Sequence, residues 1–178
     1  MSLIPGVIAS GISGHLGGNY TSIATQTVGS GGASSVTFSS IPNTYTHLQI
    51  RAIAIVGSSA INPLLTFNGD SGSNYSWHQM YGSGSSAGAS ASASYTGIGG
   101  PYTGHTQFGP QVWDILDYTN TNKNKTVRVL GGSDENGSGY VGLNSGLWIN
   151  TAAITSINIS SVSLNFNQYT TFALYGVK

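Results

Sequence analysis

Charged residues are scarce in this chain: five Lys+Arg and five Asp+Glu make up 6% of its 178 residues, against about 25% in an ordinary soluble domain. Their place is taken by 26 Gly and by Ser, Thr and Asn, which form hydrogen bonds without carrying charge. The formal net charge is zero, so copies of the chain repel one another only weakly. Phosphate binding needs clustered cations, and the single local group is Lys123, Lys125 and Arg128. We therefore expect no nucleic acid partner.

Cysteine is absent, which excludes disulfide bonds and cysteine-ligated metal sites. A long hydrophobic run is missing as well, because the apolar stretch from Leu3 to Ile12 is too short to cross a bilayer and is interrupted by Pro5, Gly6 and Gly11. No cation precedes this stretch, as one would in a secretory signal peptide. The sequence thus predicts neither a membrane partner nor a signal peptide.

What the chain does contain is a series of short segments rich in β-branched and aromatic residues, bounded by turn-forming residues. In 48–55 and 154–159, apolar and polar residues alternate with period two, which is typical of half-buried strands. No long amphipathic helical pattern occurs. We predict an all-β fold, an antiparallel and jelly-roll-like β-sandwich, with strands at 20–28, 35–38, 47–56, 64–68, 75–81, 112–118, 126–130, 146–149, 154–159 and 171–177.

The segment before the first predicted strand is apolar but is broken by glycine and proline. Free in water it would expose apolar surface, which is a recognised sign of a partner interface. We predict an extended N-terminal arm over residues 1–19 that docks on another subunit, with packing across its own domain as the alternative. The docking residues of this arm would be Leu3, Ile4, Pro5, Val7, Ile8 and Ile12.

Residues 20–178 are predicted to form a single β-sandwich domain. Within it, 82–109 is dominated by Gly, Ser and Ala, and we interpret this stretch as one long loop. Long loops in compact domains are commonly functional or disordered. Two interpretations stay open for it, a loosely ordered surface excursion or a loop that packs on a neighbouring subunit through its tyrosines.

The sequence offers little support for catalysis. Asp114 and Asp117 are the carboxylates close enough in sequence for acid/base work, but in a strand over 112–118 they would point to opposite faces. We expect one to be exposed and the other to pair with Arg51 or Arg128 across strands. The sequence therefore predicts no enzyme, no catalytic residue and no cofactor.

Metal binding has equally weak support. The segment DENGSG at 134–139 begins like a calcium loop, but its twelfth position is Ser145 in place of a bidentate carboxylate, and no helices flank it. A plain turn between two strands is the favoured interpretation. The four histidines lack the short spacings of zinc sites, so we predict no metal ligand among His15, His47, His78 and His105.

Aromatic residues offer a different kind of site. Flat rings stack on sugar rings while amides bind hydroxyls, and several tyrosines and a tryptophan lie among Asn, Ser and Gln. Tyr75, Trp77 and Tyr81 share one parity, so they would lie on one face of a strand, which is as compatible with the core as with a binding surface. The candidate subunit or glycan contacts are Trp77, Tyr81, Tyr95 and Tyr102.

Several blocks follow one another along most of the chain: SSIPNTYTHLQIR at 39–51, FNGDSGSNY at 67–75, DYTNTNK at 117–123, SGLW at 145–148, AITSI at 153–157 and FALYG at 172–176. Together with Ile4-Pro5-Gly6 in the arm, they resemble a group of tailed-bacteriophage virion proteins, where this kind of domain occurs as small separate products and in tail or fibre proteins. The stretch 82–109 matches this group least.

The resemblance implies a structural protein at the virion surface, a β-sandwich assembled as a trimer or another symmetric homo-oligomer. It brings no catalytic motif. The first hypothesis is a capsid decoration (cement) protein whose arm binds the major capsid protein or another virion protein and stabilises the shell. The alternative is a tail- or fibre-associated receptor-binding module that recognises a host surface glycan.

Overall fold

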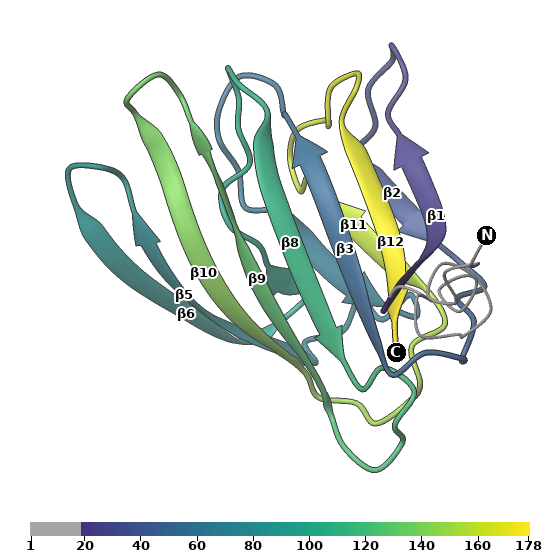
Figure 1. Cartoon of the computed structure of the whole chain (residues 1–178). Helices are drawn as coiled ribbons and strands as arrows, with labels where there is room; N and C mark the ends of the chain where they lie inside the picture. The colour runs from purple at the N-terminus through teal and green to yellow at the C-terminus, as the bar shows by residue number, and fades with distance from the viewer. Residues whose placement is uncertain (1–18) are drawn as a thin grey trace, which may run out of the picture.

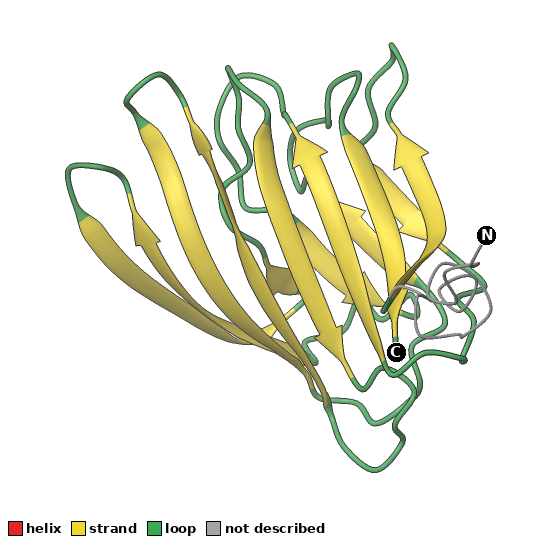
Figure 2. Cartoon of the chain, viewed as in Figure 1, coloured by secondary structure: helices red, strands yellow, loops and turns green. Residues whose placement is uncertain are grey.

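The structure is a computed structural model that describes residues 19–178. These residues form twelve β-strands and contain no helix that could cross a membrane. The predicted all-β class is confirmed (Figures 1 and 2). The strands are β1 (Tyr20–Thr27), β2 (Ser35–Phe38), β3 (His47–Ala54), β4 (Leu64–Phe67), β5 (Tyr75–Gly82), β6 (Ala87–Tyr95), β7 (Ile98–Gly99), β8 (Gly109–Leu116), β9 (Lys125–Asp134), β10 (Gly139–Trp148), β11 (Ile157–Ser160) and β12 (Thr171–Val177).

Two antiparallel sheets pack as a sandwich. The larger sheet has the order β1-β12-β3-β8-β9-β10-β5-β6 and the smaller has the order β2-β11-β4-β7. The first four strands of the larger sheet and the four of the smaller have the pairing order of a jelly roll with two Greek keys, which confirms the predicted jelly-roll-like sandwich. The remaining strands β9, β10, β5 and β6 widen the large sheet beyond β8, and we call them the sheet extension (Figure 1).

The core lies between the two sheets and is built by alternation along the strands. In β3, Ile50, Ala52 and Ala54 are buried, whereas Arg51 and Ile53 between them are exposed. This pattern confirms the period-two interpretation of the sequence. Large aromatic side chains fill much of the space, and the largest fully buried ones are Trp113, Trp148, Tyr75, Tyr118 and Phe67.

The stretch 82–109 is not the single long loop that we predicted. It contains β6, of which 87–92 pair regularly with β5, and the short β7, which pairs with β4. The sequence of β6 is AGASASASY, whose small residues have low strand propensity, so composition alone indicates a loop. Pairing with the neighbouring β5 supplies the backbone hydrogen bonds that composition does not predict.

The strand β10 begins at Gly139, seven residues before the predicted 146–149, and ends at Trp148. A Cβ atom on Gly146 would lie 2.3 Å from Cγ2 of Ile98, so glycine is required for the close approach of β7 to β10. The predicted strand 154–159 corresponds to β11, which begins at Ile157 rather than at Ile154. Tertiary packing therefore decides these boundaries.

Candidate docking surface

The outer face of the large sheet carries a row of exposed apolar side chains. Strand register places its members directly opposite one another on β8, β9, β10, β5 and β6, in the order Val112, Leu130, Leu143, Met80 and Ala89. The first four leave 36%, 56%, 47% and 67% of their surface exposed. At a strand spacing of about 4.8 Å, this apolar row runs about 19 Å across the sheet.

Two shallow depressions open along the apolar row. One of about 470 Å³ is lined by Met80, Ala89 and Leu143. The other, of about 570 Å³, lies toward the turn between β9 and β10 and is lined by Leu130 and Val141, of which Val141 is 60% exposed. Contiguous exposed apolar surface on a soluble protein marks an interaction site. The outer face of the sheet extension is therefore the strongest docking surface among residues 19–178.

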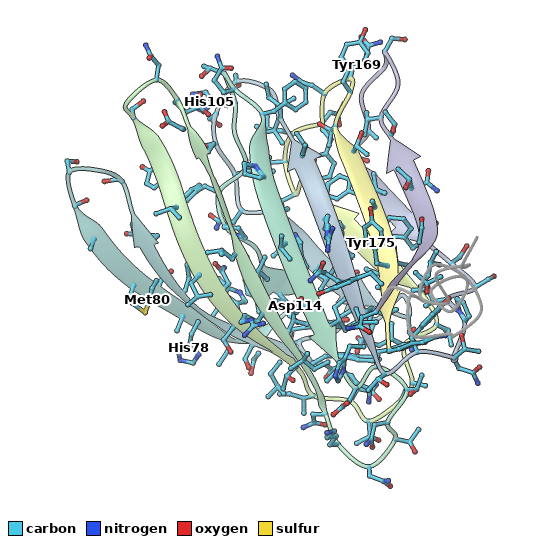
Figure 3. All side chains as sticks on the ribbon, viewed as in Figure 1. His78, Met80, His105, Asp114, Tyr169 and Tyr175 are labelled. Carbon is cyan, nitrogen blue, oxygen red and sulfur yellow. The ribbon has the colours of Figure 1, made fainter. Side chains whose placement is uncertain are left out.

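A polar row lies beside the apolar row on the same face of the sheet. Its members are two residues away from those of the apolar row on each strand. The Arg128 guanidinium donates a hydrogen bond to the Asp114 carboxylate at 2.8 Å, and the Gln49 amide donates to the same carboxylate at 2.8 Å. Ser145 and His78 continue this row onto β10 and β5, with His78 and Met80 exposed side by side on the extension (Figure 3). The charges of Arg128 and Asp114 neutralise each other, so the polar row carries no net charge toward a docking partner.

Sequence analysis did not identify the apolar row, although a signal for it exists. Val129 and Leu130 are consecutive apolar residues in β9, and Val112 and Trp113 are consecutive in β8. Side chains alternate between the two faces of a strand, so one member of each pair must point away from the core. Consecutive apolar residues predict a strand with two buried faces, and here the second face has no covering layer among the described residues.

The four aromatic residues predicted as subunit or glycan contacts form two pairs. Trp77 and Tyr95 meet edge to face with ring centroids 6.2 Å apart, and Tyr81 meets Tyr102 in the same way at 6.3 Å. Tyr140, which sequence analysis did not single out, stacks on Tyr102 at 4.3 Å. The structure therefore brings Tyr81, Tyr102 and Tyr140 together from three separate parts of the chain.

A polar cavity of about 310 Å³ lies beside Tyr140 at the end of β9, and His105 and Glu135 contribute to its walls. The Glu135 carboxylate accepts hydrogen bonds from the backbone N–H groups of His105 at 3.0 Å and Thr106 at 3.1 Å. Burial acts to raise the pKa of Glu135, but these hydrogen bonds outweigh it and the pKa is lowered. The cavity thus holds a charged carboxylate and one aromatic ring, that of Tyr140.

The segment 134–139 forms the turn between β9 and β10, as the favoured interpretation predicted. The Glu135 N–H donates to the Ser138 carbonyl at 2.8 Å, and the Asp134 carboxylate accepts from the Gly137 N–H at 3.0 Å. The carboxylates of Asp134 and Glu135 therefore both accept hydrogen bonds from backbone N–H groups. In the part of the chain that the structure describes, no three His, Asp or Glu side chains gather in a way that could hold a metal ion.

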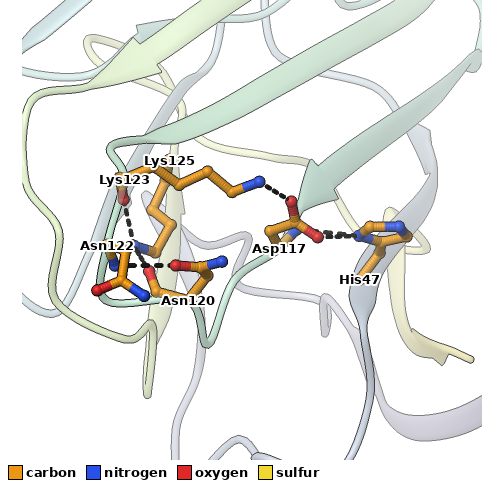
Figure 4. A network of polar contacts seen from close by, with 6 residues as sticks. All are labelled: His47, Asp117, Asn120, Asn122, Lys123 and Lys125. Carbon is orange, nitrogen blue, oxygen red and sulfur yellow. Dashed lines mark hydrogen bonds and ion pairs between the residues drawn. The ribbon is translucent and has the colours of Figure 1, made fainter.

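The carboxylates Asp114 and Asp117 take different partners. Asp114 pairs with Arg128, which was one of its two predicted partners. Asp117 lies beyond the end of β8 rather than in the predicted strand, has a φ of 47°, and pairs with Lys123, which holds its pKa below the ordinary value (Figure 4). The Asp117 N–H donates to Nδ1 of His47 at 2.9 Å. The two carboxylates serve separate networks.

Lys125 is fully buried, although the sequence places it in the most cationic segment. Its ammonium group donates to the carbonyl oxygens of Asn120 at 2.6 Å, Lys123 at 3.0 Å and Thr151 at 2.9 Å. Burial lowers the pKa of Lys125. In the same loop the Asn122 N–H donates to the Asn120 side chain (Figure 4). Lys125 thus holds the loop between β8 and β9 in place and is not available to an anionic ligand.

The predicted docking arm lies outside the described residues, apart from Asn19. Its contacts through Leu3, Ile4, Pro5, Val7, Ile8 and Ile12 stay a prediction. The described candidates for interaction are the apolar row and the cavity beside Tyr140.

Comparison with known proteins identifies no relative: no family model, no curated protein and no solved structure matches this chain.

Proposed function

We propose that this chain is a structural protein of a tailed-bacteriophage virion, and within that class a capsid decoration (cement) protein on the outside of the shell. The observation that carries the proposal is the apolar row, an exposed and uncharged strip on the widened sheet of a chain with zero net charge. The sequence blocks that resemble phage virion proteins direct the choice of partner toward the major capsid protein or another virion protein. The role is adhesive rather than catalytic.

The energetics of the apolar row suit such a contact. Complete burial of one exposed leucine side chain contributes about 1.5–3 kcal/mol, and Leu130 and Leu143 lie side by side at the middle of the row. A neutral chain can also occupy neighbouring lattice positions without electrostatic repulsion between its copies. Jelly rolls occur in viral capsid and lectin domains, but the fold by itself does not select between them. The homo-oligomer, and the trimer in particular, belongs to the same proposal.

Particles assembled without this protein are expected to lose resistance to heat and osmotic shock, and added purified protein should restore it. A Leu130→Ser/Leu143→Ser variant should bind these particles at least about tenfold more weakly, because the exposed half of each leucine no longer becomes buried. The measurement is the number of copies bound per particle as a function of protein concentration, together with the temperature at which the particles release their DNA.

The matched control is Ile149→Ser, which removes an aliphatic side chain that is 53% exposed just beyond the end of β10. This variant should bind and protect like the wild type. Particles that lack the protein yet keep full resistance, and that show no vacant positions on the shell, would exclude the cement role.

The second candidate is a receptor-binding module that recognises a host glycan. The cavity next to Tyr140 favours it, because aromatic rings and a charged carboxylate occur together in sugar-binding sites. We expect the purified protein to bind a defined subset of glycans on an array, and a Tyr140→Ala variant to lose that binding while its unfolding temperature changes little. If the wild-type protein bound no glycan on the array even at high concentration, this candidate function would be contradicted.

A further inference from the structure

Strand β6 is a long and unprotected edge of the large sheet. Of the four sheet edges in the described chain, β2 and β7 are four and two residues long, and β1 contains a register shift between Ser22 and Ala24. β6 has nine residues, of which 87–92 pair regularly with β5. It contains no proline and no charged residue, the usual devices that prevent an edge from pairing with another strand.

The direction of the backbone groups on β6 follows from hydrogen bonds at both ends of β5. The Ser83 N–H donates to the Ser86 carbonyl at 2.9 Å, and the Asn74 carbonyl accepts from the Ile149 N–H at 2.7 Å. In antiparallel pairs, hydrogen-bonded and non-hydrogen-bonded positions alternate. Counting from either end gives the same result: the N–H and C=O groups that face the open edge belong to Ala87, Ala89 and Ala91.

Side chains leave this edge accessible on both faces of the sheet. On the outer face it presents the methyl groups of the same three alanines, and on the inner face it presents Gly88 and Ser90. A Cβ atom at 88 would lie 2.6 Å from the tip of the Tyr81 ring, so this ring lies over the glycine. Another strand can therefore approach within pairing distance of about 4.8 Å without displacing a large side chain.

We propose that β6 pairs antiparallel with β6 of a second copy of this chain, across a two-fold axis at Ala89. In this register Ala89 lies opposite its own counterpart, and Ala87 lies opposite Ala91 in both directions. All three outward-facing residues then exchange hydrogen bonds, about six in total. The two large sheets become one continuous sheet of two molecules.

The apolar row favours this register over the one centred on Ser90. Ala89 is the last member of the row, opposite Met80, whereas Ala91 belongs to the polar row, opposite His78. With Ala89 at the axis, the apolar row of one copy runs without a step into that of the other. A shift of the axis to Ser90 would instead place Ala89, in the apolar row, opposite Ala91 of the other copy, so the apolar row of one copy would meet the polar row of the other. The uncharged edge adds no repulsion between the two copies.

Single-cysteine variants test the register directly, since the chain has no cysteine of its own. Opposed residues of a hydrogen-bonded pair have Cα atoms about 5.5 Å apart, which lies within the range of about 4.4–6.8 Å for a disulfide. Mild oxidation should convert the full-length Ala89→Cys variant to a covalent dimer at least about tenfold faster than the Ala91→Cys variant, whose thiols lie too far apart. Equal rates in the two variants, or faster linkage of Ala91→Cys, would overturn the proposed register.

The mass of the protein in solution tests the contact itself. We expect the mass of the wild-type protein in solution to be an even multiple of the chain mass of 18.3 kDa. Ala89→Lys places two ammonium groups at the axis and should raise the dimer dissociation constant at least about 100-fold. The control Thr25→Lys adds the same charge to the exposed β1 at the opposite edge of the sheet and should leave the mass unchanged.

A wild-type mass of one chain at all concentrations, or a mass of two or three chains that Ala89→Lys does not change, would overturn this pairing. Both measurements are made on purified protein without particles. A failure of β6 pairing is therefore distinguishable from a failure of the cement role, which is measured on the shell.

Discussion

Replacement of Trp148 by alanine is expected to lower the free energy of unfolding by about 3–5 kcal/mol, because a large core side chain is lost and a cavity remains. Trp148 is 1% exposed, stacks on Tyr75 with ring centroids 6.2 Å apart, and lies 5.4 Å from the ring of Phe67. Its indole N–H also donates to the Asp70 carboxylate at 2.7 Å. Urea denaturation of the purified variant, followed by tryptophan fluorescence and circular dichroism, measures the loss.

Trp148→Phe separates packing from the hydrogen bond. It keeps an aromatic ring in the core but removes the indole N–H, which is the main cause of the lowered pKa of Asp70. A carboxylate with a lowered folded-state pKa stabilises the fold above its unfolded pKa, and this contribution is lost as the pH falls through the folded-state value. Below about pH 4, the stability of Trp148→Phe should therefore fall less steeply than that of the wild type. A Trp148→Ala variant within about 1 kcal/mol of the wild type would contradict the assignment of Trp148 to the core.

Replacement of Lys125 by methionine is expected to cost about 2–4 kcal/mol, because three carbonyl oxygens lose their shared donor. Methionine has a similar length and fills most of the space of the lysine chain, so packing changes little. The carbonyls of Asn120, Lys123 and Thr151 connect the β8–β9 loop to the segment after β10, and Lys125 joins them. Amide hydrogen exchange in residues 117–124 should rise together with the loss of global stability.

Lys123→Met is the matched control, with the same substitution two positions earlier. The Lys123 side chain is 54% exposed and pairs with Asp117 at the surface. Exposed ion pairs contribute about 0–1 kcal/mol, so this variant should remain close to the wild type. Equal losses in the two variants would show that the buried ammonium group has no special role in holding the loop.

Part of the fold was predictable because it depends on local alternation. In β3 the buried Leu48, Ile50 and Ala52 lie at every second position, and the strand occupies its predicted place in the core. β6 was not predictable in this way, because its alternation is between Ala and Ser or Gly, which differ little in hydrophobicity. Its strand conformation depends on hydrogen bonds to β5, which the residues of β6 do not encode by themselves.

In the candidate surfaces, too, some contacts were predictable from the sequence and others depend on the tertiary structure. The pairing of Asp114 with Arg128 could be predicted from opposite charges on strands of suitable parity. The contact of Tyr102 with Tyr140 could not, because the two residues are far apart in sequence and meet only where the start of β10 lies beside the segment after β7. The same limit applied to Lys125, whose burial depends on carbonyl groups from two separate loops.

By itself the sequence determined that this protein is an all-β sandwich with very little charge, because alternation, turn residues and composition are local properties of the chain. Only the tertiary structure decided which apolar residues stay outside. Leu130, Leu143 and Met80 become neighbours through strand register, and they stay exposed because the smaller sheet packs on the other face of the large sheet. Register and layer assignment are long-range properties, so an uncharged chain acquires its adhesive strip and its open edge only on folding.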